Sequence, residues 1–225
     1  SNDKIHLLMK TLGIVGGGQL GRMMAEAAQK IGVAVVVLDP TPGCPASAFA
    51  RQVVGDFKDY ETVKAFAKEA DVLTFEIESA NAEALSELSD TGYSVHPSPR
   101  TLSIIRDKLA QKKFLTENGI AVAPFLEVNI EEDARRAGET LGFPFVLKAR
   151  SGGYDGRGNF TVQSSEDIPT AFEKLGGARL YAEKFIPFEK ELAVVAVRSE
   201  SGEIRTYPTV ETVHENHIWV LGRMP

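Results

Sequence analysis

Three glycines place the strongest constraint on how this chain can fold. Gly16, Gly18 and Gly21 follow the apolar run 11–15 directly and precede a helical pattern at 19–31. Glycine lets the backbone turn tightly and approach a ligand, so a G-x-G-x-x-G spacing between a strand and a helix is typical of nucleotide-binding α/β units. The segment therefore predicts a strand–turn–helix unit at the start of the fold.

The first half of the chain alternates between short apolar runs and amphipathic stretches. After the glycines, the sequence predicts strands at 33–38, 52–54 and 72–75, and helices at 59–69 and 82–88. Alternating strands and helices of this kind are typical of a parallel sheet with helices on its faces. We therefore expect a doubly wound α/β domain over residues 10–97.

A pair of prolines divides the sequence near its middle. Pro97 and Pro99 interrupt the alternation, which favours a domain boundary, and we expect a second domain over residues 98–225. Its pattern predicts an α+β unit with a mainly antiparallel sheet, with helices at 101–118, 131–141 and 169–175 and strands at 145–149, 160–162, 180–183, 192–198 and 204–210. The sequence ends on apolar residues without a polar tail, and we expect it to stop within this domain.

Composition excludes several classes of partner. The net charge of −6 argues against an extended nucleic-acid surface, and a single cysteine, Cys44, argues against an internal disulfide and for a reducing compartment. The longest apolar run, 33–38, is too short to cross a membrane, and the first residues lack the pattern of a signal peptide. We expect a cytoplasmic protein with no nucleic-acid or membrane partner.

Asp39 gives the glycine turn more than one interpretation. It ends the second predicted strand eighteen residues after Gly21, where the ribose-binding acid of a dinucleotide site would lie. Alternatively, the glycines only make a tight turn and Asp39 caps the turn that begins at Pro40. In a third interpretation, free N–H groups at the helix N-terminus bind one phosphorylated ligand. This segment leaves all three open.

Two glutamates follow the predicted strand 72–75. Glu76 and Glu78 stand at the edge where open α/β sheets bind their ligands. Glu76 is predicted to face the glycine turn and Glu78 to point away from it. Glu76 could accept hydrogen bonds from ribose hydroxyls or an amine, whereas two solvated loop acids are the alternative.

Lys148 interrupts an otherwise apolar strand and precedes a glycine-rich loop. The side chain is predicted either to point into a binding site or to be unusually buried, and a buried unpaired ammonium group is costly. The loop 152–158 has four glycines around Tyr154, Asp155 and Arg157, and such a loop can close its N–H groups on phosphate oxygens or move as a lid. A plain hairpin turn explains the glycines but not the lysine.

The segment 181–194 predicts a second contact with a nucleotide. Its strand ends in Glu183, Lys184, Phe185 and Ile186, and a new strand begins at Glu191 after a proline. A free strand edge can offer backbone groups to an adenine, and a carboxylate a few residues further on can accept from ribose hydroxyls. A hairpin with charged flanks is the alternative.

Other motifs are weak or absent. His214 and His217 lie three residues apart without a helical pattern or a third ligand, so we predict no metal site from them. Cys44 has no neighbouring partner that would make it a nucleophile. No G-x-x-x-x-G-K-[ST] segment occurs, which excludes a P-loop.

The motifs together resemble one enzyme family. GIVGGGQLGRM, FEIE, RDKLAQKKFL, GFPFVLKARSGGYDGRGNF, LYAEKFIPFEKELAV and TYPTVETVH occur in the order found in 5-(carboxyamino)imidazole ribonucleotide synthetases of the ATP-grasp superfamily, and most closely in the fungal form. The resemblance implies a Rossmann-like pre-ATP-grasp domain over 10–97. It also implies the first part of an ATP-grasp domain over 98–225, including an α+β lid subdomain at about 146–212 and lacking a third region.

The resemblance also implies a reaction. These ligases join bicarbonate to the exocyclic amine of aminoimidazole ribonucleotide and cleave ATP to ADP and phosphate, with carboxyphosphate as the expected intermediate. Alignment and charge neutralisation dominate such a phosphoryl transfer. It further implies a homodimer and, in the fungal form, fusion to a downstream carboxylase domain. The family's magnesium ligands are expected beyond this chain, so we predict Mg²⁺ as a cofactor but no metal ligand here.

Matching positions carry the family's roles to this sequence. Lys148, Asp155 and Arg157 are the expected catalytic residues, and the loop 153–159 is expected to cover the phosphates. The resemblance implies ATP contacts from Lys108, Lys148, Gly153, Tyr154, Asp155, Gly156, Arg157, Gly158, Asn159, Glu183, Lys184, Phe185, Ile186, Glu191 and His214. It implies acceptor contacts from Gln19, Leu20, Glu76, Tyr154, Asp155 and Arg157.

Three other functions remain alternatives. A related ATP-grasp ligase, such as the formate-dependent glycinamide ribonucleotide transformylase, would share most of these motifs. An NAD-binding oxidoreductase or regulatory module would use the glycine turn and Asp39 instead. A fragment that only binds nucleotide would lack turnover.

Overall fold

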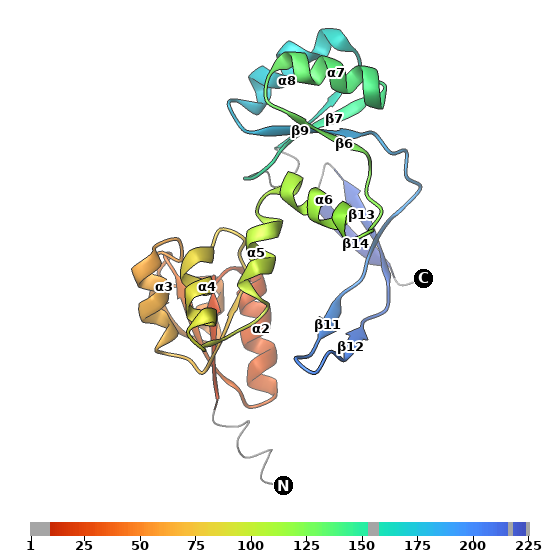
Figure 1. The fold of residues 1–225 in the computed structure, drawn as a ribbon. Coiled ribbons are helices and arrows are strands. Elements are labelled where there is room, and N and C mark those ends of the chain that lie inside the picture. The colour runs from red at the N-terminus through yellow and green to blue at the C-terminus, as the bar shows by residue number, and fades with distance from the viewer. Residues whose placement is uncertain (1–9, 153–157, 216–217, 224–225) are drawn as a thin grey trace. The chain divides into compact units, whose positions relative to one another are not determined.

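The computed structural model describes residues 10–152, 158–215 and 218–223, with side chains described up to residue 213. The chain forms two compact units, one ending at Phe114 and the other starting at Leu115. Figure 1 shows the elements of both units. None of the helices in the described part of the chain is long and apolar enough to cross a membrane.

The first unit is built on a parallel sheet of five strands in the order β3-β2-β1-β4-β5. Its strands are β1 (Thr11–Val15), β2 (Ala34–Asp39), β3 (Arg51–Val54), β4 (Val72–Phe75) and β5 (Ser94–Val95). Its helices are α2 (Gln19–Lys30), the short η1 (Pro45–Ala48), α3 (Tyr60–Ala67) and α4 (Ala82–Asp90). The predicted α/β alternation is confirmed, whereas η1 and β5 were not predicted.

Helices cover both faces of this sheet because its strands are apolar on both sides. Val36 and Leu38 of β2 belong to one core cluster with side chains of α3 and α4, such as Phe66 and Leu85. Val37, one position along the strand, packs in a second cluster that includes residues of α2. Strand alternation thus sends successive residues of β2 into two cores, as expected for a doubly wound sheet.

The predicted helix at 101–118 is two helices. α5 (Pro99–Ile105) ends before Arg106, and α6 (Lys108–Glu117) begins after Asp107. The Asp107 Oδ1 atom accepts hydrogen bonds from the N–H groups of Leu109 and Ala110 at 3.0 and 3.2 Å, so this carboxylate caps a new helix start. The prediction of one continuous helix was therefore wrong.

The first unit also continues past the predicted domain limit. Leu102 of α5 is fully buried in the same core cluster as α3 and α4, and the compact unit runs to Phe114. The domain limit at 97/98 stays a prediction.

The second unit contains an antiparallel sheet in the order β6-β9-β7-β8. These strands are β6 (Phe125–Val128), β7 (Phe145–Ala149), β8 (Asn159–Val162) and β9 (Leu180–Lys184), and the helices are α7 (Glu131–Leu141), the short η2 (Ser165–Asp167) and α8 (Ile168–Leu175). α7 and α8 lie together on one face of this sheet (Figure 1). The predicted hairpin of β7 and β8 is confirmed, whereas β6 was not predicted.

Two predicted strands of the second unit are each split in two. The segment 192–198 forms β10 (Glu191–Ala193) and β11 (Ala196–Arg198), and 204–210 ends β12 (Ile204–Thr206) before β13 (Val210–Glu215) begins. β11 pairs with β12, while β10 pairs with β13, which also pairs with β14 (Ile218–Arg223). Pro208 has no N–H to donate to a ladder, which separates β12 from β13.

Candidate functional site

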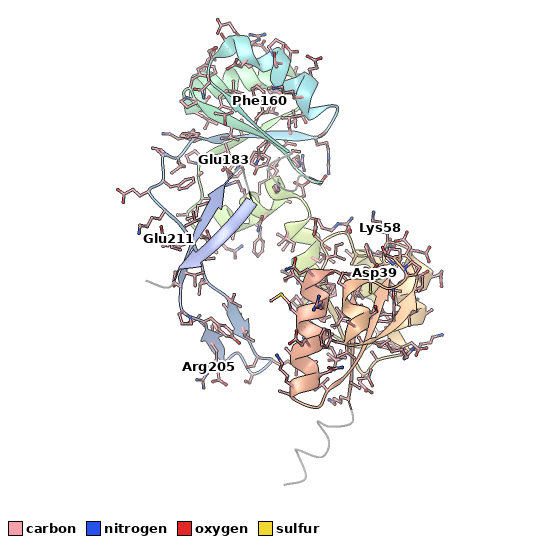
Figure 2. The ribbon with its side chains drawn as sticks, turned by 180° about the vertical axis from the view of Figure 1, so that it is seen from behind. Asp39, Lys58, Phe160, Glu183, Arg205 and Glu211 are labelled. Carbon is pink, nitrogen blue, oxygen red and sulfur yellow. The ribbon has the colours of Figure 1, made fainter. Side chains whose placement is uncertain are left out.

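The glycine turn lies at the carboxyl edge of the first sheet. β1 is flanked by β2 on one side and β4 on the other, so the chain order reverses across β1. In open α/β sheets, ligands bind at this point of reversal. Asp39 ends β2 at the same edge, as labelled in Figure 2, and Glu76 follows β4. The predicted meeting of the glycines with Glu76 is confirmed.

Two carboxylates hold the backbone of this turn. The Gly17 N–H donates to Asp39 Oδ2 at 2.9 Å, and the Gly18 N–H donates to Glu76 Oε1 at 3.0 Å. Gly16 has a φ of +101°, a conformation that L side chains rarely adopt. The turn is therefore fixed by both strain-free glycine geometry and charge-assisted hydrogen bonds.

Close packing explains why the turn needs glycine at further positions. A Cβ atom on Gly17 would lie 2.4 Å from the Cys44 sulfur, and one on Gly21 would lie 2.7 Å from the Gly16 carbonyl oxygen. The Ala46 N–H also donates to the Gly17 carbonyl at 3.0 Å, so η1 packs against the turn. Burial raises the pKa of the Cys44 thiol, which makes it less reactive.

Asp39 does not present a free carboxylate at the sheet edge. It is 9% exposed, and its Oδ1 atom accepts the Thr41 N–H at 2.8 Å while Oδ2 holds Gly17. The interpretation in which Asp39 caps the turn at Pro40 is confirmed. A ribose-binding acid would need oxygens directed toward a ligand, which this arrangement does not provide.

Glu76 is half-buried beside the start of α2. Burial raises its pKa above the ordinary value of 4.5, the Gly18 N–H lowers it, and the carboxylates of Asp39 and Glu78 raise it further. Gln19 and Leu20 lie in the first turn of α2 and are exposed, while Glu78 is exposed on the loop after β4. The structure thus brings three of the six predicted acceptor residues, Gln19, Leu20 and Glu76, to one edge of the first sheet.

Lys148 lies on the face of the second sheet opposite α7 and α8. Phe145, Leu147 and Ala149 of β7 point into the core, so Lys148 alternates to the opposite face. Its Nζ atom lies 2.8 Å from Glu183 Oε1 on β9, and the two side chains are 23% and 14% exposed. Figure 2 labels Glu183. Lys148 thus points away from the core, and its partner Glu183 is another predicted site residue; its contact with ATP stays a prediction.

A second ion pair crosses the same face and was missed from the sequence. Arg150 is two residues beyond Lys148, and its Nη1 atom lies 2.8 Å from Glu127 Oε1 on β6. Alternation along β7 could have placed Arg150 beside Lys148, but β6 was not predicted, so its carboxylate had no position. The face therefore carries two cations and two carboxylates.

The end of β9 has an exposed apolar segment. The Lys184 N–H donates to the Pro124 carbonyl at 2.8 Å, which ties the strand to the segment before β6. Phe185 and Ile186 follow and are 42% and 44% exposed, as a stacking surface for a planar ring requires. Glu191 is exposed as the first residue of β10.

Some of the remaining predicted site residues are described by the structure, and others are not. Lys108 begins α6 and belongs to the first unit, whereas Lys148 belongs to the second. Gly158 is buried, and its carbonyl accepts the Ala149 N–H at 2.7 Å, while Asn159 begins β8. Five predicted residues, Gly153, Tyr154, Asp155, Gly156 and Arg157, lie outside the described residues, as does the side chain of His214.

Two family matches cover nearly the whole chain. The "Ribonucleotide synthetase preATP-grasp domain" matches residues 9–106, and the "ATP-grasp domain" matches residues 113–225. They correspond closely to the doubly wound unit and to the unit that carries Lys148. The chain belongs to the ATP-grasp family.

One curated relative and one solved structure are similar to this chain over most of its length. The chain is 45% identical over 214 residues to phosphoribosylaminoimidazole carboxylase of Ogataea methanolica, covering 93% of this chain and 39% of that protein. Its fold matches carboxyaminoimidazole ribonucleotide synthase of Aspergillus clavatus complexed with ATP, with a TM-score of 0.88 and 41% identity over 95% of this chain and 56% of the other.

A second Aspergillus clavatus structure contains ADP and 5-aminoimidazole ribonucleotide. It matches with a TM-score of 0.85 and 41% identity, covering 93% of this chain and 55% of that one. The chain therefore spans about half the length of the solved relatives and less of the fungal carboxylase.

Proposed function

We propose that this chain is the nucleotide-binding portion of an ATP-dependent ligase that carboxylates 5-aminoimidazole ribonucleotide with bicarbonate. The observation that carries the proposal is the face of β7 and β9 opposite α7 and α8, where Lys148 and Glu183 meet at 2.8 Å. Relatives with the same fold were crystallised with ATP, and with ADP and 5-aminoimidazole ribonucleotide. Lys148 supplies the positive charge that triphosphate oxygens require.

The reaction proceeds in two displacements. A bicarbonate oxygen attacks the γ-phosphorus of ATP, the bond to the ADP oxygen breaks, and carboxyphosphate forms. The exocyclic amine then attacks the carboxyl carbon, phosphate leaves with the bonding electron pair, and the amine loses a proton. Lys148 stabilises the charge that develops on the phosphoryl oxygens during the first displacement.

The segment that follows β9 and the start of β10 orient the nucleotide. Phe185 and Ile186 offer exposed apolar surface to the adenine ring, and Glu191 accepts hydrogen bonds from the ribose hydroxyls. Lys184 precedes Phe185 and belongs to the segment that contacts the adenine. Gly158 and Asn159 contact the phosphates, and Lys108 adds a phosphate contact to that of Lys148. The ATP contacts of 153–157 and His214 rest on the resemblance alone.

The acceptor ribonucleotide contacts the glycine turn of the first unit. Glu76 accepts a hydrogen bond from it, and Gln19 and Leu20 of α2 lie beside it. Tyr154, Asp155 and Arg157 complete this proposal on the resemblance alone, with Asp155 and Arg157 acting in catalysis together with Lys148.

Further parts of the enzyme belong to the same proposal. Mg²⁺ neutralises phosphate charge when bound, and its ligands lie in a region downstream of these 225 residues. We also infer a cytoplasmic homodimer and, from the fungal relatives, a fused carboxylase domain.

Phosphate release by the full-length enzyme tests the proposal. Release that requires ATP, bicarbonate and 5-aminoimidazole ribonucleotide together is the expected result. Release that requires formate and glycinamide ribonucleotide instead would replace this function with that of the transformylase. Micromolar binding of NADH that resists ATP would favour the dinucleotide interpretation.

A further inference from the structure

Two backbone amides of the glycine turn are already occupied by carboxylates of the chain itself. In dinucleotide-binding folds, amides between the first strand and the following helix receive the pyrophosphate of the ligand. Here the Gly17 N–H binds Asp39 at 2.9 Å and the Gly18 N–H binds Glu76 at 3.0 Å. The positions that a phosphate oxygen would take therefore hold carboxylate oxygens.

Both carboxylates are held firmly by their own elements. Asp39 ends β2, is almost fully buried, and also accepts the Thr41 N–H. The Glu76 N–H donates to the Val15 carbonyl at 3.1 Å, which fixes this residue beside β1. Neither side chain can withdraw without leaving a backbone amide of the turn without its acceptor, and an unsatisfied buried amide is costly.

Charge sets which ligand groups can approach. A phosphate at the turn would meet two carboxylates at short range in a partly buried site, where like charges repel strongly. A hydroxyl or amine would instead find an acceptor in Glu76. The same glycine spacing that binds pyrophosphate in other folds thus favours hydrogen-bond donors here.

We propose that Asp39 is a positioning and specificity residue, which acts with Glu76 to fill the anion position of the glycine turn. The turn then rejects phosphate and presents Glu76 to a hydroxyl or amine of the acceptor. Asp39 acts through Gly17, because its Oδ2 atom fixes the amide that precedes the Glu76-bound amide of Gly18. The identity of the acceptor rests on the proposed function, whereas the exclusion of phosphate does not.

Binding of inorganic pyrophosphate to the 225-residue chain tests the exclusion directly. The double variant Asp39→Asn/Glu76→Gln keeps the shapes of both side chains and removes both charges. We expect its Gly17 and Gly18 amide resonances to shift on titration, with affinity at least about tenfold above that of the unsubstituted chain. Equal affinities in the two proteins would overturn the proposal.

A matched control separates this effect from net charge. The variant Asp56→Asn/Glu78→Gln also removes two carboxylates, and Asp56 likewise accepts a backbone N–H, that of Lys58, at 2.8 Å. Its pyrophosphate affinity should equal that of the unsubstituted chain, and a gain as large as in the test variant would contradict the proposal. If the test variant loses its cooperative melt, each single substitution is titrated, and each should show part of the gain.

Kinetics of the full-length enzyme test the positioning role. Asp39→Ala should raise the KM for the acceptor about tenfold, with a smaller change in the KM for ATP, and Asp39→Asn should restore part of the loss. Equal changes in both KM values would show a general structural effect and overturn the positioning role. An unsubstituted enzyme that does not use the acceptor would refute the proposed function but not the pyrophosphate result.

Discussion

The two candidate ligand-binding regions use carboxylates in opposite ways. At the glycine turn, Asp39 and Glu76 bind backbone amides and lock the conformation of the turn. On the second sheet, Glu183 binds the ammonium group of Lys148. An amide cannot change its partner without moving the backbone, whereas a lysine can exchange a carboxylate for a phosphate by rotating its side chain. We infer that the first region keeps anionic groups away from the glycine turn, whereas the second can bind an anionic ligand.

Of the predicted changes, removal of the Lys148 ammonium group should have the largest effect. Lys148→Ala in the full-length enzyme should lower turnover about 10²–10³-fold, because one donor to the developing phosphoryl charge is lost. The fold should persist, since Lys148 lies on the face opposite the core. Steady-state phosphate release and a thermal melt together measure the two effects.

Lys174→Ala is the matched control for this prediction. Lys174 belongs to the same unit, but its ammonium group lies over the Phe160 ring, 5.1 Å from the centroid, on the helix-covered side of the sheet. Turnover should stay within about twofold of the unsubstituted rate, as for most surface substitutions. Comparable losses in the two variants would remove the special role of Lys148.

Leu147, which precedes Lys148, tests the difference between the two faces of β7. Leu147 is fully buried in the core between the sheet, α7 and α8. Leu147→Ala should therefore lower the free energy of unfolding by about 2–5 kcal/mol. Urea denaturation of the 225-residue chain measures this loss, and Lys148→Ala should show a clearly smaller one. Equal losses would mean that both residues of β7 act in packing.

The pattern of apolar residues was sufficient to predict most of the fold. β1, β4, β7 and α7 have the predicted limits because their apolar periodicity is clear, and glycines directly follow β1 and α7. The failures occurred where tertiary pairing decides the structure. β10 and β11 pair with different partners although the sequence between them stays apolar, and Asp107 starts a helix inside a continuous helical pattern.

The candidate site was predictable in its residues but not in its contacts. Lys148 stood out because it interrupts an apolar strand, and Glu76 because it follows one. Their partners are separated by 35 and 58 residues, and only the sheet order brings them together. Asp39 shows the same limit, since its sequence position fits a ribose ligand while its hydrogen bonds are with the backbone.

Adding one methyl group at the glycine turn should lower the free energy of unfolding less than Leu147→Ala does. In Gly17→Ala, the new Cβ atom would lie 2.4 Å from the Cys44 sulfur and 3.0 Å from the Asp39 Cβ atom. Such overpacking costs about 1–3 kcal/mol of stability. Thermal denaturation measures the loss.

A second substitution tests the cause of this loss. Cys44→Ala removes the sulfur but leaves the Cys44 Cβ atom 3.2 Å from the added methyl group. The double variant Gly17→Ala/Cys44→Ala should therefore recover part of the stability lost by Gly17→Ala, beyond additivity. Strict additivity of the two effects would contradict a direct clash with the sulfur.

The smallest expected effect is a dependence of stability on pH at Glu76. Burial raises the pKa of Glu76 in the folded state above 4.5, so the folded state holds this proton more tightly than the unfolded state. Stability contributed by the protonated group is present below pH 4.5 and falls as the pH rises through the raised pKa.

The variant Glu76→Gln tests this dependence, because glutamine does not titrate and still offers an oxygen to the Gly18 N–H. The melting temperature of Glu76→Gln relative to the unsubstituted chain should therefore increase between pH 4 and pH 7, by an amount that corresponds to less than about 1 kcal/mol. Glu78→Gln removes an exposed carboxylate from the same loop. An equal trend in both variants would show that net charge, and not the burial of Glu76 against the glycine turn, sets the dependence.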